Sequence, residues 1–279
     1  MKFSILIANY NNGKFFKECY NSILVQEYKN WEAVILDDAS TDNSVDVIKN
    51  IIGNDERFRF FENDKNSGVG VTKSKLIELA NGDICGFVDP DDAITSNAVF
   101  SSIKVFEKKK DVVLTYTKFA KCDENLKPIE VPKIVHQVIN NNPYFFNCPV
   151  NIVHFVCFRK SIYNQTEKMN TVMKIAEDQD LYLKMYEKGK VEFIDETNYL
   201  YRLHSGGISQ NDNKPTSREY FAKVIFNAMK RRKLKTIHGK PIPEEYTNSK
   251  DIYGLLEYQN SFSFRAKKKL IIFAQQIFS

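Results

Sequence analysis

Residues 84–92 read ICGFVDPDD, a short apolar run that ends in three aspartates around a proline. The apolar part, Ile84–Val88, is too short for a helix, and its unbroken apolar character is typical of a strand buried on both faces. Phe3–Ala8 (FSILIA) and Trp31–Leu36 (WEAVIL) show the same pattern, and the second is also followed by aspartates. Strands of this kind form the inside of a parallel sheet, so the three runs predict an α/β fold.

Segments with helical periodicity separate these strands. Apolar residues recur at three- and four-residue spacing between Phe15 and Leu24, between Val45 and Ile52, and from Leu76 to Ala80. The alternation continues to a strand at Val112–Tyr116. It predicts a mixed, mostly parallel sheet flanked by helices.

The pattern becomes irregular after this strand. Residues from about Lys121 to Pro149 are polar and contain no clear period, which is typical of a functional loop, and we expect this loop to shape a pocket. Strand-like runs at Ile152–Phe158 and Val191–Ile194 flank a helix-like segment at Asp178–Lys188. Beyond Gln210 the spacing predicts a helical C-terminal extension.

The composition excludes several classes of protein. The 279 residues are 43% hydrophobic and 27% charged, as in ordinary globular proteins, so a disordered or low-complexity chain is excluded. The formal net charge of +5 is too small to indicate binding to nucleic acid. The sequence has no apolar stretch near the roughly 18 residues of a membrane span, and Met1 leads straight into the first strand. We therefore expect a cytoplasmic protein.

Two acidic clusters follow predicted strands. Asp37 and Asp38 form the first, and Asp89, Asp91 and Asp92 form the second. Ligands bind beyond the carboxyl ends of the strands in open parallel sheets, so both clusters are expected at the ligand-binding edge. Crowded carboxylates repel one another without a cation, and hard oxygen ligands suit Mg²⁺ or Mn²⁺ bound to substrate phosphates, which indicates a nucleoside diphosphate. The alternative is that these aspartates are ordinary turn residues that face water.

Five stretches stand in a fixed order along the chain: SILIANYNNGKFFKECYNSILVQ, VILDDASTDNS, NSGVGVTKSKLIELANGDICGFVDPDD, AEDQDLYLKM and YRLHSGGIS. In this order and spacing they resemble a family 2 glycosyltransferase with the GT-A fold, over about Phe3–Ser209. The resemblance implies an inverting enzyme that moves a sugar from a nucleotide donor, a UDP-sugar, to a hydroxyl of a glycan or lipid-linked acceptor in surface polysaccharide biosynthesis. We divide the chain into a catalytic domain, 1–210, with a nucleotide-sugar-binding half (1–116) and an acceptor half (117–210), and a basic helical extension, 211–279.

The resemblance implies roles on the donor side. Ala8, Asn9 and Tyr10 match the stretch that lines the base pocket, although an ordinary strand-end turn is the alternative. Asp38 matches the carboxylate that accepts a hydrogen bond from the base, which suits a group that only accepts. Asp89 matches the acid that meets the ribose.

The resemblance also implies a metal site. Asp91, Asp92 and His204 match its ligands, with Mn²⁺ or Mg²⁺ as the expected cofactor, and both aspartates remain candidates for direct binding. His204 lies in YRLHSGGIS, which matches a segment that closes over the donor, with Gly206–Gly207 as its hinge. Arg202 in the same segment is expected to stabilise charge on the departing diphosphate.

Lys73 departs from the family pattern, because Thr72-Lys73-Ser74 stands where Ala-Arg-Asn is usual. A lysine can neutralise phosphate as a point charge but lacks the planar fork of arginine. The alternative is a solvated lysine on a helix.

Glu177-Asp178 matches the Glu-Asp motif of the family, whose aspartate is the general base. Asp178 would remove the proton of the acceptor hydroxyl as its oxygen attacks the anomeric carbon. Glu177 would hold the loop or touch the acceptor, and Asp180 is expected to be an exposed helix residue. The alternative is that these acids merely complement the helix dipole.

The extension is rich in cations. Lys230–Lys233 and Arg265 with Lys267–Lys269 precede the apolar Leu270–Phe273. A basic run followed by an apolar stretch can lie on an anionic bilayer, so one expectation is peripheral contact with the inner face of a membrane. The other is a helix that packs on the catalytic domain or on a second subunit.

Two other functions compete with glycosyl transfer. A nucleotidyltransferase would share the sheet and the carboxylate-bound cation, but it needs a glycine-rich basic loop after the first strand, and Asn9–Lys14 contains one glycine. A non-catalytic nucleotide- or sugar-binding module would keep the fold without turnover. Intact Asp91, Asp92 and Asp178 disfavour the second alternative.

Overall fold

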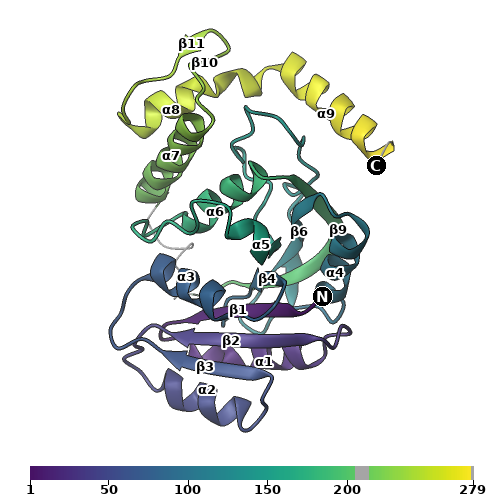
Figure 1. Ribbon diagram of the computed structural model, residues 1–279, viewed down its shortest axis with the longest axis vertical. Coiled ribbons are helices and arrows are strands. Elements are labelled where there is room, and N and C mark those ends of the chain that lie inside the picture. Colours follow the sequence, from purple (N-terminus) through teal and green to yellow (C-terminus); the bar gives the residue numbers. More distant parts are fainter. Residues whose placement is uncertain (205–213, 278–279) are drawn as a thin grey trace.

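The six predicted strands all lie in one mixed sheet. The computed structural model describes residues 1–204 and 214–277. Over these residues the main sheet has nine strands, in the order β3-β2-β1-β4-β8-β6-β9-β5 with β7 paired to β6 (Figure 1). The strands are β1 (Phe3–Asn9), β2 (Trp31–Asp37), β3 (Phe58–Glu62), β4 (Ile84–Phe87), β5 (Ala93–Ile94), β6 (Val112–Cys122), β7 (Pro128–Glu130), β8 (His154–Arg159) and β9 (Lys190–Arg202).

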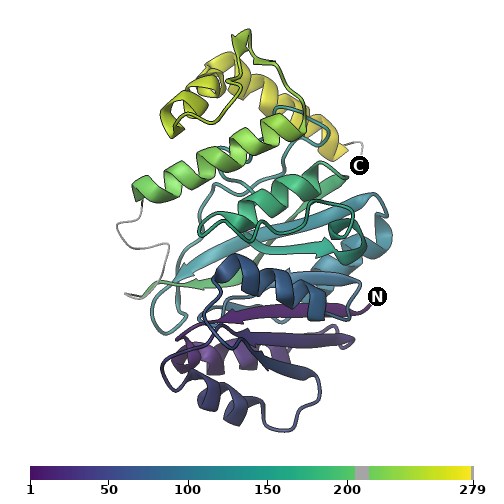
Figure 2. The same cartoon turned by 60° about the vertical axis from the view of Figure 1, so that its left-hand side comes forward.

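Helices cover both faces of this sheet. The crossovers through α1 and α2 lead from β1 to β3, and α3 leads back to β4, so right-handed crossovers place α3 on the opposite face. Figures 1 and 2 show α3 apart from α1 and α2, on the side where α6 lies. These elements and the remaining helices are η1 (Gly13–Phe15), α1 (Phe16–Leu24), α2 (Ser44–Ile52), α3 (Val69–Leu79), α4 (Ala98–Lys108), α5 (Lys160–Tyr163), α6 (Glu177–Tyr186), α7 (Lys214–Arg231), α8 (Ser249–Leu255), η3 (Glu257–Asn260) and α9 (Phe262–Ile277).

The strand directions decide where functional residues meet. β3, β2, β1 and β4 are mutually parallel. β8 is antiparallel to both β4 and β6, and β6 is parallel to β9, so β6 and β9 run in the same direction as β1. The carboxyl ends of β1, β2, β4, β6 and β9 therefore lie at one edge, as the sequence predicted for the two acidic clusters.

The inner strands are buried as their apolar sequences predict. Every residue of β2 is buried, and in β1 only Ala8 is partly exposed. β9 differs from the prediction, because Val191–Ile194 is only the start of a strand that continues to Arg202. β9 pairs with β6 and β5, but some of its residues, such as Asp195, are exposed. Because β9 is not buried on both faces, its sequence is not a continuous apolar run.

The C-terminal extension has its own core, which includes catalytic-domain residues. Phe146, Met173 and Leu183 pack with apolar residues of α7 and α8 in this second cluster. A short antiparallel pair, β10 (Thr236–Ile237) and β11 (Lys240–Pro241), interrupts the predicted helices. Among the described residues, none of the helices has the length and apolar content that crossing a bilayer requires.

Glu32 is a charged residue inside the sheet, at the edge opposite the acidic clusters. It is 3% exposed. Burial on its own would raise the pKa of Glu32, but hydrogen bonds from Ser4, Asn81 and Lys2 outweigh it and lower the pKa from 4.5 to about 2. The donors to its carboxylate are Ser4 Oγ (2.7 Å), Asn81 N (2.5 Å), Asn81 Nδ2 (3.2 Å), Lys2 Nζ (3.0 Å) and Arg59 Nη1 (3.4 Å).

We expect Glu32→Gln to lower the free energy of unfolding at pH 7 by about 2–3 kcal/mol, because the buried donors lose a charged acceptor. The pKa is lower in the folded than in the unfolded chain, so the wild-type protein has this stabilisation above pH 4.5 and loses it as the pH falls towards 2. Urea unfolding followed by the fluorescence of Trp31 measures both effects. The exposed Glu56→Gln is the control, and equal stabilities of all three proteins across this pH range would contradict the assignment.

Candidate active site

Asp37 builds the loop that follows β2. Its Oδ2 accepts hydrogen bonds from Asn9 Nδ2 and Ser40 Oγ, both at 2.6 Å, and its Oδ1 accepts from Ser40 N at 2.7 Å. Asn9 is thereby held beneath the loop and is 1% exposed, whereas Ala8 is half-buried and Tyr10 is 44% exposed. Of the three residues predicted for the base pocket, Tyr10 is the one whose side chain faces outwards.

Asp38 holds the loop that precedes α3. Its Oδ1 accepts from Asn63 Nδ2 at 2.7 Å and Ser67 N at 2.9 Å, and its Oδ2 accepts from Gly68 N at 2.8 Å. Gly68 has a φ of 86°, which a residue with a side chain rarely adopts. A carboxylate has about four acceptor positions, so these three donors leave capacity for a base. The role of Asp38 in base recognition stays a prediction.

The turn Asp89–Asp92 is tied to the end of β9. Asp92 is 1% exposed, and its Oδ1 accepts a hydrogen bond from the backbone N of Arg202 at 2.8 Å. Asp91 is more open, with a side chain 18% exposed, and its Oδ2 lies 2.8 Å from His204 Nε2. The two aspartates that the sequence left equivalent therefore differ: Asp92 faces the protein, and Asp91 faces His204.

Arg202 lies inside this arrangement and is 2% exposed. Its Nε donates to the carbonyl oxygen of Asp91 at 2.6 Å, and its Nη1 donates to the carbonyl oxygen of Glu124. The guanidinium lies over the ring of Phe15, 4.9 Å from its centroid. These contacts fix the turn between β4 and β5, and the predicted contact of Arg202 with a diphosphate stays a prediction.

His204 packs against the same aromatic ring. Its ring centroid is 4.5 Å from that of Phe15, and its side chain is 6% exposed. Asp91 and His204 offer a carboxylate oxygen and an imidazole nitrogen side by side, which suits a divalent cation whose other ligands come from a substrate. Over residues 1–204 and 214–277, no group of three or more His, Cys, Asp or Glu side chains is arranged to hold a metal ion. The predicted hinge Gly206–Gly207 lies outside the described residues.

Lys73 joins α3 to α6. Its Nζ lies 2.8 Å from Oε1 of Glu177, and the two side chains are 13% and 7% exposed. The alternative of a solvated lysine is therefore wrong. α3 carries this lysine on the face that turns towards α6, so the ion pair spans the two halves of the predicted catalytic domain.

Asp178 stands beside this ion pair at the start of α6. Ala176 precedes the helix in the left-handed region, with φ of 64°, an uncommon conformation for a residue with a side chain. Burial and the neighbouring Glu177 raise the pKa of Asp178, whereas Lys73 and hydrogen bonds from Gln179 lower it. Asp178 is thus a carboxylate with raised basicity beside a fixed cation.

Asp89 is close enough to the Lys73–Glu177 ion pair, to Asp178 and to Asp91 for their charges to change its pKa. Burial raises the pKa of Asp89 and Lys73 lowers it, and with the charges of Asp91, Asp178 and Glu177, which also raise it, the pKa reaches about 6. The structure therefore brings the predicted ribose residue Asp89 close both to the predicted metal ligand Asp91 and to the predicted general base Asp178. This constellation can hold a phosphate-bearing ligand on one side and accept a proton on the other.

His154 and two tyrosines form an aromatic layer next to this site that the sequence analysis missed. The His154 ring stacks on Tyr199 at 4.7 Å, with Phe119 and Tyr201 close by. Burial and the charge of Lys73 lower the pKa of His154 to about 3, so its ring is neutral. The alternation of Tyr199 and Tyr201 on one face of β9 was the available signal.

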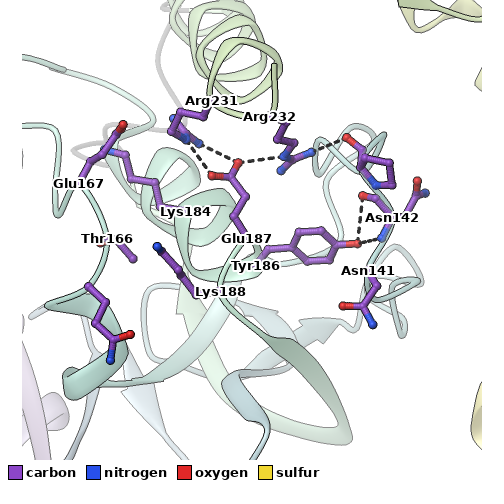
Figure 3. A pocket seen from close by; sticks show the side chains of 12 residues that line it. Asn141, Asn142, Thr166, Glu167, Lys184, Tyr186, Glu187, Lys188, Arg231 and Arg232 are labelled. Atoms are coloured by element: carbon purple, nitrogen blue, oxygen red, sulfur yellow. Dashed lines mark hydrogen bonds and ion pairs between the residues drawn. The ribbon is translucent and has the colours of Figure 1, made fainter. Parts of the chain in front are cut away.

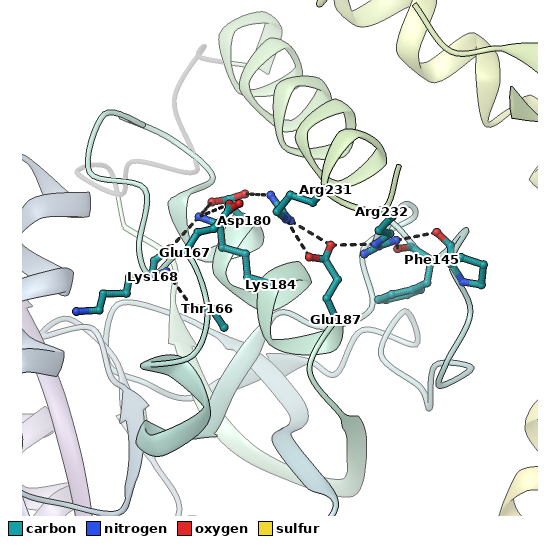
Figure 4. Close-up of polar contacts among 10 residues, drawn as sticks. Phe145, Thr166, Glu167, Lys168, Asp180, Lys184, Glu187, Arg231 and Arg232 are labelled. Carbon is teal, nitrogen blue, oxygen red and sulfur yellow. Dashed lines mark hydrogen bonds and ion pairs between the residues drawn. The ribbon is translucent and has the colours of Figure 1, made fainter. Parts of the chain in front are cut away.

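Asp180 is not the exposed helix residue that the sequence predicted. It is 1% exposed, with its carboxylate 2.6 Å from Lys184 Nζ and 3.1 Å from Arg231 Nη1. Arg231 and Arg232 both pair with Glu187, so they do not belong to a free basic run (Figure 4). The prediction failed because α7 packs on this face of α6 and buries it.

A cavity of about 710 Å³ lies at the C-terminal end of α6. Asn141–Pro143, Thr166, Lys188 and Arg232 are among its lining residues, which come from two loops and from the C-terminal ends of α6 and α7 with the residues that directly follow them (Figure 3). The expectation that the long polar loop shapes a pocket is thus confirmed for Asn141–Pro143. The lining includes no residue of the carboxylate site.

Comparison with known families decides the identity of this fold and site. The family model described as glycosyl transferase family 2 matches residues 4–166, which include β1, β2, β4 and the turn Asp89–Asp92. The chain belongs to this family. It is a glycosyltransferase, as the five ordered motifs predicted.

This glycosyltransferase is similar to curated relatives over most of its length. It is 28% identical over 221 residues to the glycosyltransferase GlyG of Streptococcus pneumoniae. The aligned residues are 75% of this chain and 73% of the relative. It is 27% identical to the chondroitin synthase of Escherichia coli over 249 residues, and these are 86% of this chain. The glycosyltransferase spans only 34% of that synthase.

The fold is shared with solved structures. The crystal structure of S. aureus TarS 1–349 in complex with UDP-GlcNAc superposes with a TM-score of 0.69 at 20% identity. The likeness covers 94% of this glycosyltransferase and 73% of that chain. It confirms the expected GT-A fold.

We expect Lys73→Met to lower the free energy of unfolding by about 3 kcal/mol, because it leaves Glu177 buried without its cation among other carboxylates. In Lys73→Met/Glu177→Gln the loss should be smaller, since the unpaired charge is removed as well. Urea unfolding of the wild type, both single variants and the double variant gives the coupling energy. Additive effects of the two substitutions would contradict an ion pair that joins the two halves.

Proposed function

We propose that this glycosyltransferase moves a sugar from a UDP-sugar to a hydroxyl of a glycan or lipid-linked acceptor, with inversion, in the synthesis of a surface polysaccharide. In this proposal residues 1–210 catalyse transfer and residues 211–279 form an extension packed on them. The observation that carries the proposal is that the buried Asp89 feels the charge of Asp91, which pairs with His204, and also the charges of Lys73, Glu177 and Asp178.

The donor occupies the side formed by β1 and β2. The base lies against Ala8, Asn9 and Tyr10, and the N3–H of uracil donates to Asp38. Hydrogen bonds from the loop before α3 hold the Asp38 carboxylate in one orientation, which lowers the entropic cost of recognising the base. Asp89 accepts a ribose hydroxyl, whose hydrogen bond would stabilise its charged form.

A divalent cation, Mn²⁺ or Mg²⁺, belongs with Asp91 and His204. The oxygen and nitrogen donors of this pair fit Mn²⁺ well, and oxygens of the donor diphosphate would complete the set. When bound, the cation neutralises charge that develops on the departing diphosphate. Asp92 and Arg202 act as positioning residues, because they tie the turn that carries Asp91 to the end of β9.

Asp178 is the general base in this proposal. It takes the proton of the acceptor hydroxyl while the hydroxyl oxygen forms a bond to the anomeric carbon. The bond between that carbon and the diphosphate oxygen breaks on the opposite face, and its electron pair leaves with the UDP. The raised pKa of Asp178 makes it a stronger proton acceptor than an exposed aspartate.

Lys73 supplies a cation for the donor diphosphate in this proposal. In this structure its Nζ binds Glu177. A donor diphosphate would compete for the same ammonium group, as the sequence predicted for this position. Glu177 orients the start of α6, and through it Asp178.

The choice of UDP and of a polysaccharide product rests on the relatives. The solved structure of TarS carries UDP-GlcNAc, and the chondroitin synthase of E. coli is named for a polysaccharide product. Likeness at 20% and 27% identity makes both assignments proposals for this chain.

We expect Asp178→Asn to lower kcat at least about 10³-fold while the Kd for UDP changes little, because the amide cannot take the proton but keeps the shape of the site. The measurement is UDP release from UDP-sugars with lipid-linked or oligosaccharide acceptors, beside calorimetric titration with UDP. Asp46→Asn, on the exposed side of α2, is the control. Near-normal transfer by Asp178→Asn would show that another group accepts the proton.

A further inference from the structure

α9 presents a stripe of exposed apolar side chains. Phe262, Leu270 and Phe273 are 87%, 70% and 63% exposed. At about 100° of rotation per residue these three positions fall within about 80° of one another on the helix. The opposite side of α9 faces the protein, where the ring of Phe264 lies 5.0 Å from that of Tyr258. An apolar stripe of this length on a water-facing helix marks an interaction site.

Cations flank this stripe on both sides. On the same helical projection Arg265 and Lys269 lie along one border and Lys267 along the other, and all three are exposed. The α9 sequence contains four basic residues and no Asp or Glu. An apolar stripe between cationic borders is the pattern of helices that lie in a membrane interface.

A second segment adds an apolar residue near α9. Ile134, in the loop between β7 and β8, is 50% exposed. In both views part of this teal loop lies beside α9 (Figures 1 and 2). Burial and the charge of Lys268 lower the pKa of His136, which also indicates that this segment and α9 are close. Ile134 and the exposed residues of α9 are together called the α9 surface below.

We propose that the α9 surface binds an anionic lipid bilayer, with Leu270 and Phe273 at the level of the acyl chains and Arg265, Lys267 and Lys269 among the head groups. A second copy of the chain would also cover the stripe. It would bring Arg265, Lys267 and Lys269 of one α9 against the same three cations of another, and α9 has no acidic residue to pair with them, so like charges would repel. The charge of α9 therefore favours an anionic partner.

The α9 surface is separate from the two arginines at the C-terminal end of α7. Arg231 and Arg232, which the sequence grouped with the basic tail, pair with Glu187 and are not available to lipid. Binding to vesicles is measured without donor or acceptor, so the result does not depend on the proposed reaction. Its failure would leave the proposed transferase function untouched.

The test is sedimentation of the full chain with vesicles of phosphatidylglycerol and phosphatidylcholine, in a ratio of about one to two, and with vesicles of phosphatidylcholine alone. We expect the wild type to bind the anionic vesicles, and Arg265→Glu/Lys267→Glu/Lys269→Glu to lower the partition coefficient at least about tenfold. The control, Lys104→Glu/Lys108→Glu/Lys110→Glu, changes the net charge equally at exposed positions on and just after α4 and should bind as the wild type does.

A second pair of variants tests the apolar stripe. Leu270→Ser/Phe273→Ser should lower binding at least about fivefold at a salt concentration that screens the charges, whereas Val25→Ser/Phe100→Ser, also at exposed apolar positions, should not. Far-UV circular dichroism confirms that each variant is folded.

Three results would overturn the proposal. The first is equal binding of the α9 variants and their controls, and the second is equal binding of the wild type to neutral and anionic vesicles. The third is a dimer in light scattering that Leu270→Ser/Phe273→Ser converts to a monomer, with no binding to vesicles, which would identify a second copy as the occupant.

Discussion

Mutual repulsion of carboxylates at one sheet edge is the constraint on which the rest of the site depends. Burial, together with the nearby charges of Asp91, Asp178 and Glu177, raises the pKa of Asp89 to about 6. The ammonium of Lys73 offsets this repulsion, at 2.8 Å from Glu177. Since α3 carries the lysine and α6 carries the glutamate, the same ion pair that allows these charges to coexist also fixes α6 against α3.

Much of this arrangement could be predicted from the sequence. Parallel strands buried on both faces have unbroken apolar sequences, and β1, β2 and β4 therefore stood out in FSILIA, WEAVIL and ICGFV. The directions of such strands place the residues that follow them at one edge. The ordered motifs then predicted the family, which the match over residues 4–166 confirms, and the fold, which the likeness to TarS confirms.

Contacts between distant segments could not be predicted. Asp91 and Asp92 are neighbours in sequence, but the docking of β9 buries Asp92 against the backbone of Arg202 and leaves Asp91 beside His204. Asp180 and Arg231 both had the local pattern of exposed helix residues, and only the packing of α7 on α6 pairs them. The β9 strand was predicted too short because the residues after Ile194 include polar ones that break the apolar run, although they belong to the strand that pairs with β6 and β5.

Calorimetric titration with UDP tests the central claim most directly, namely that this edge holds a nucleotide diphosphate together with a divalent cation. The account predicts that UDP binds the wild type at least about tenfold more tightly with Mn²⁺ than with a chelator, and that Asp91→Asn removes most of this difference without unfolding the chain. GDP and dTDP in the same series show whether the base is selected. Equal affinity for UDP with Mn²⁺ and with chelator in the folded wild type, or no binding of any of the three, would contradict it.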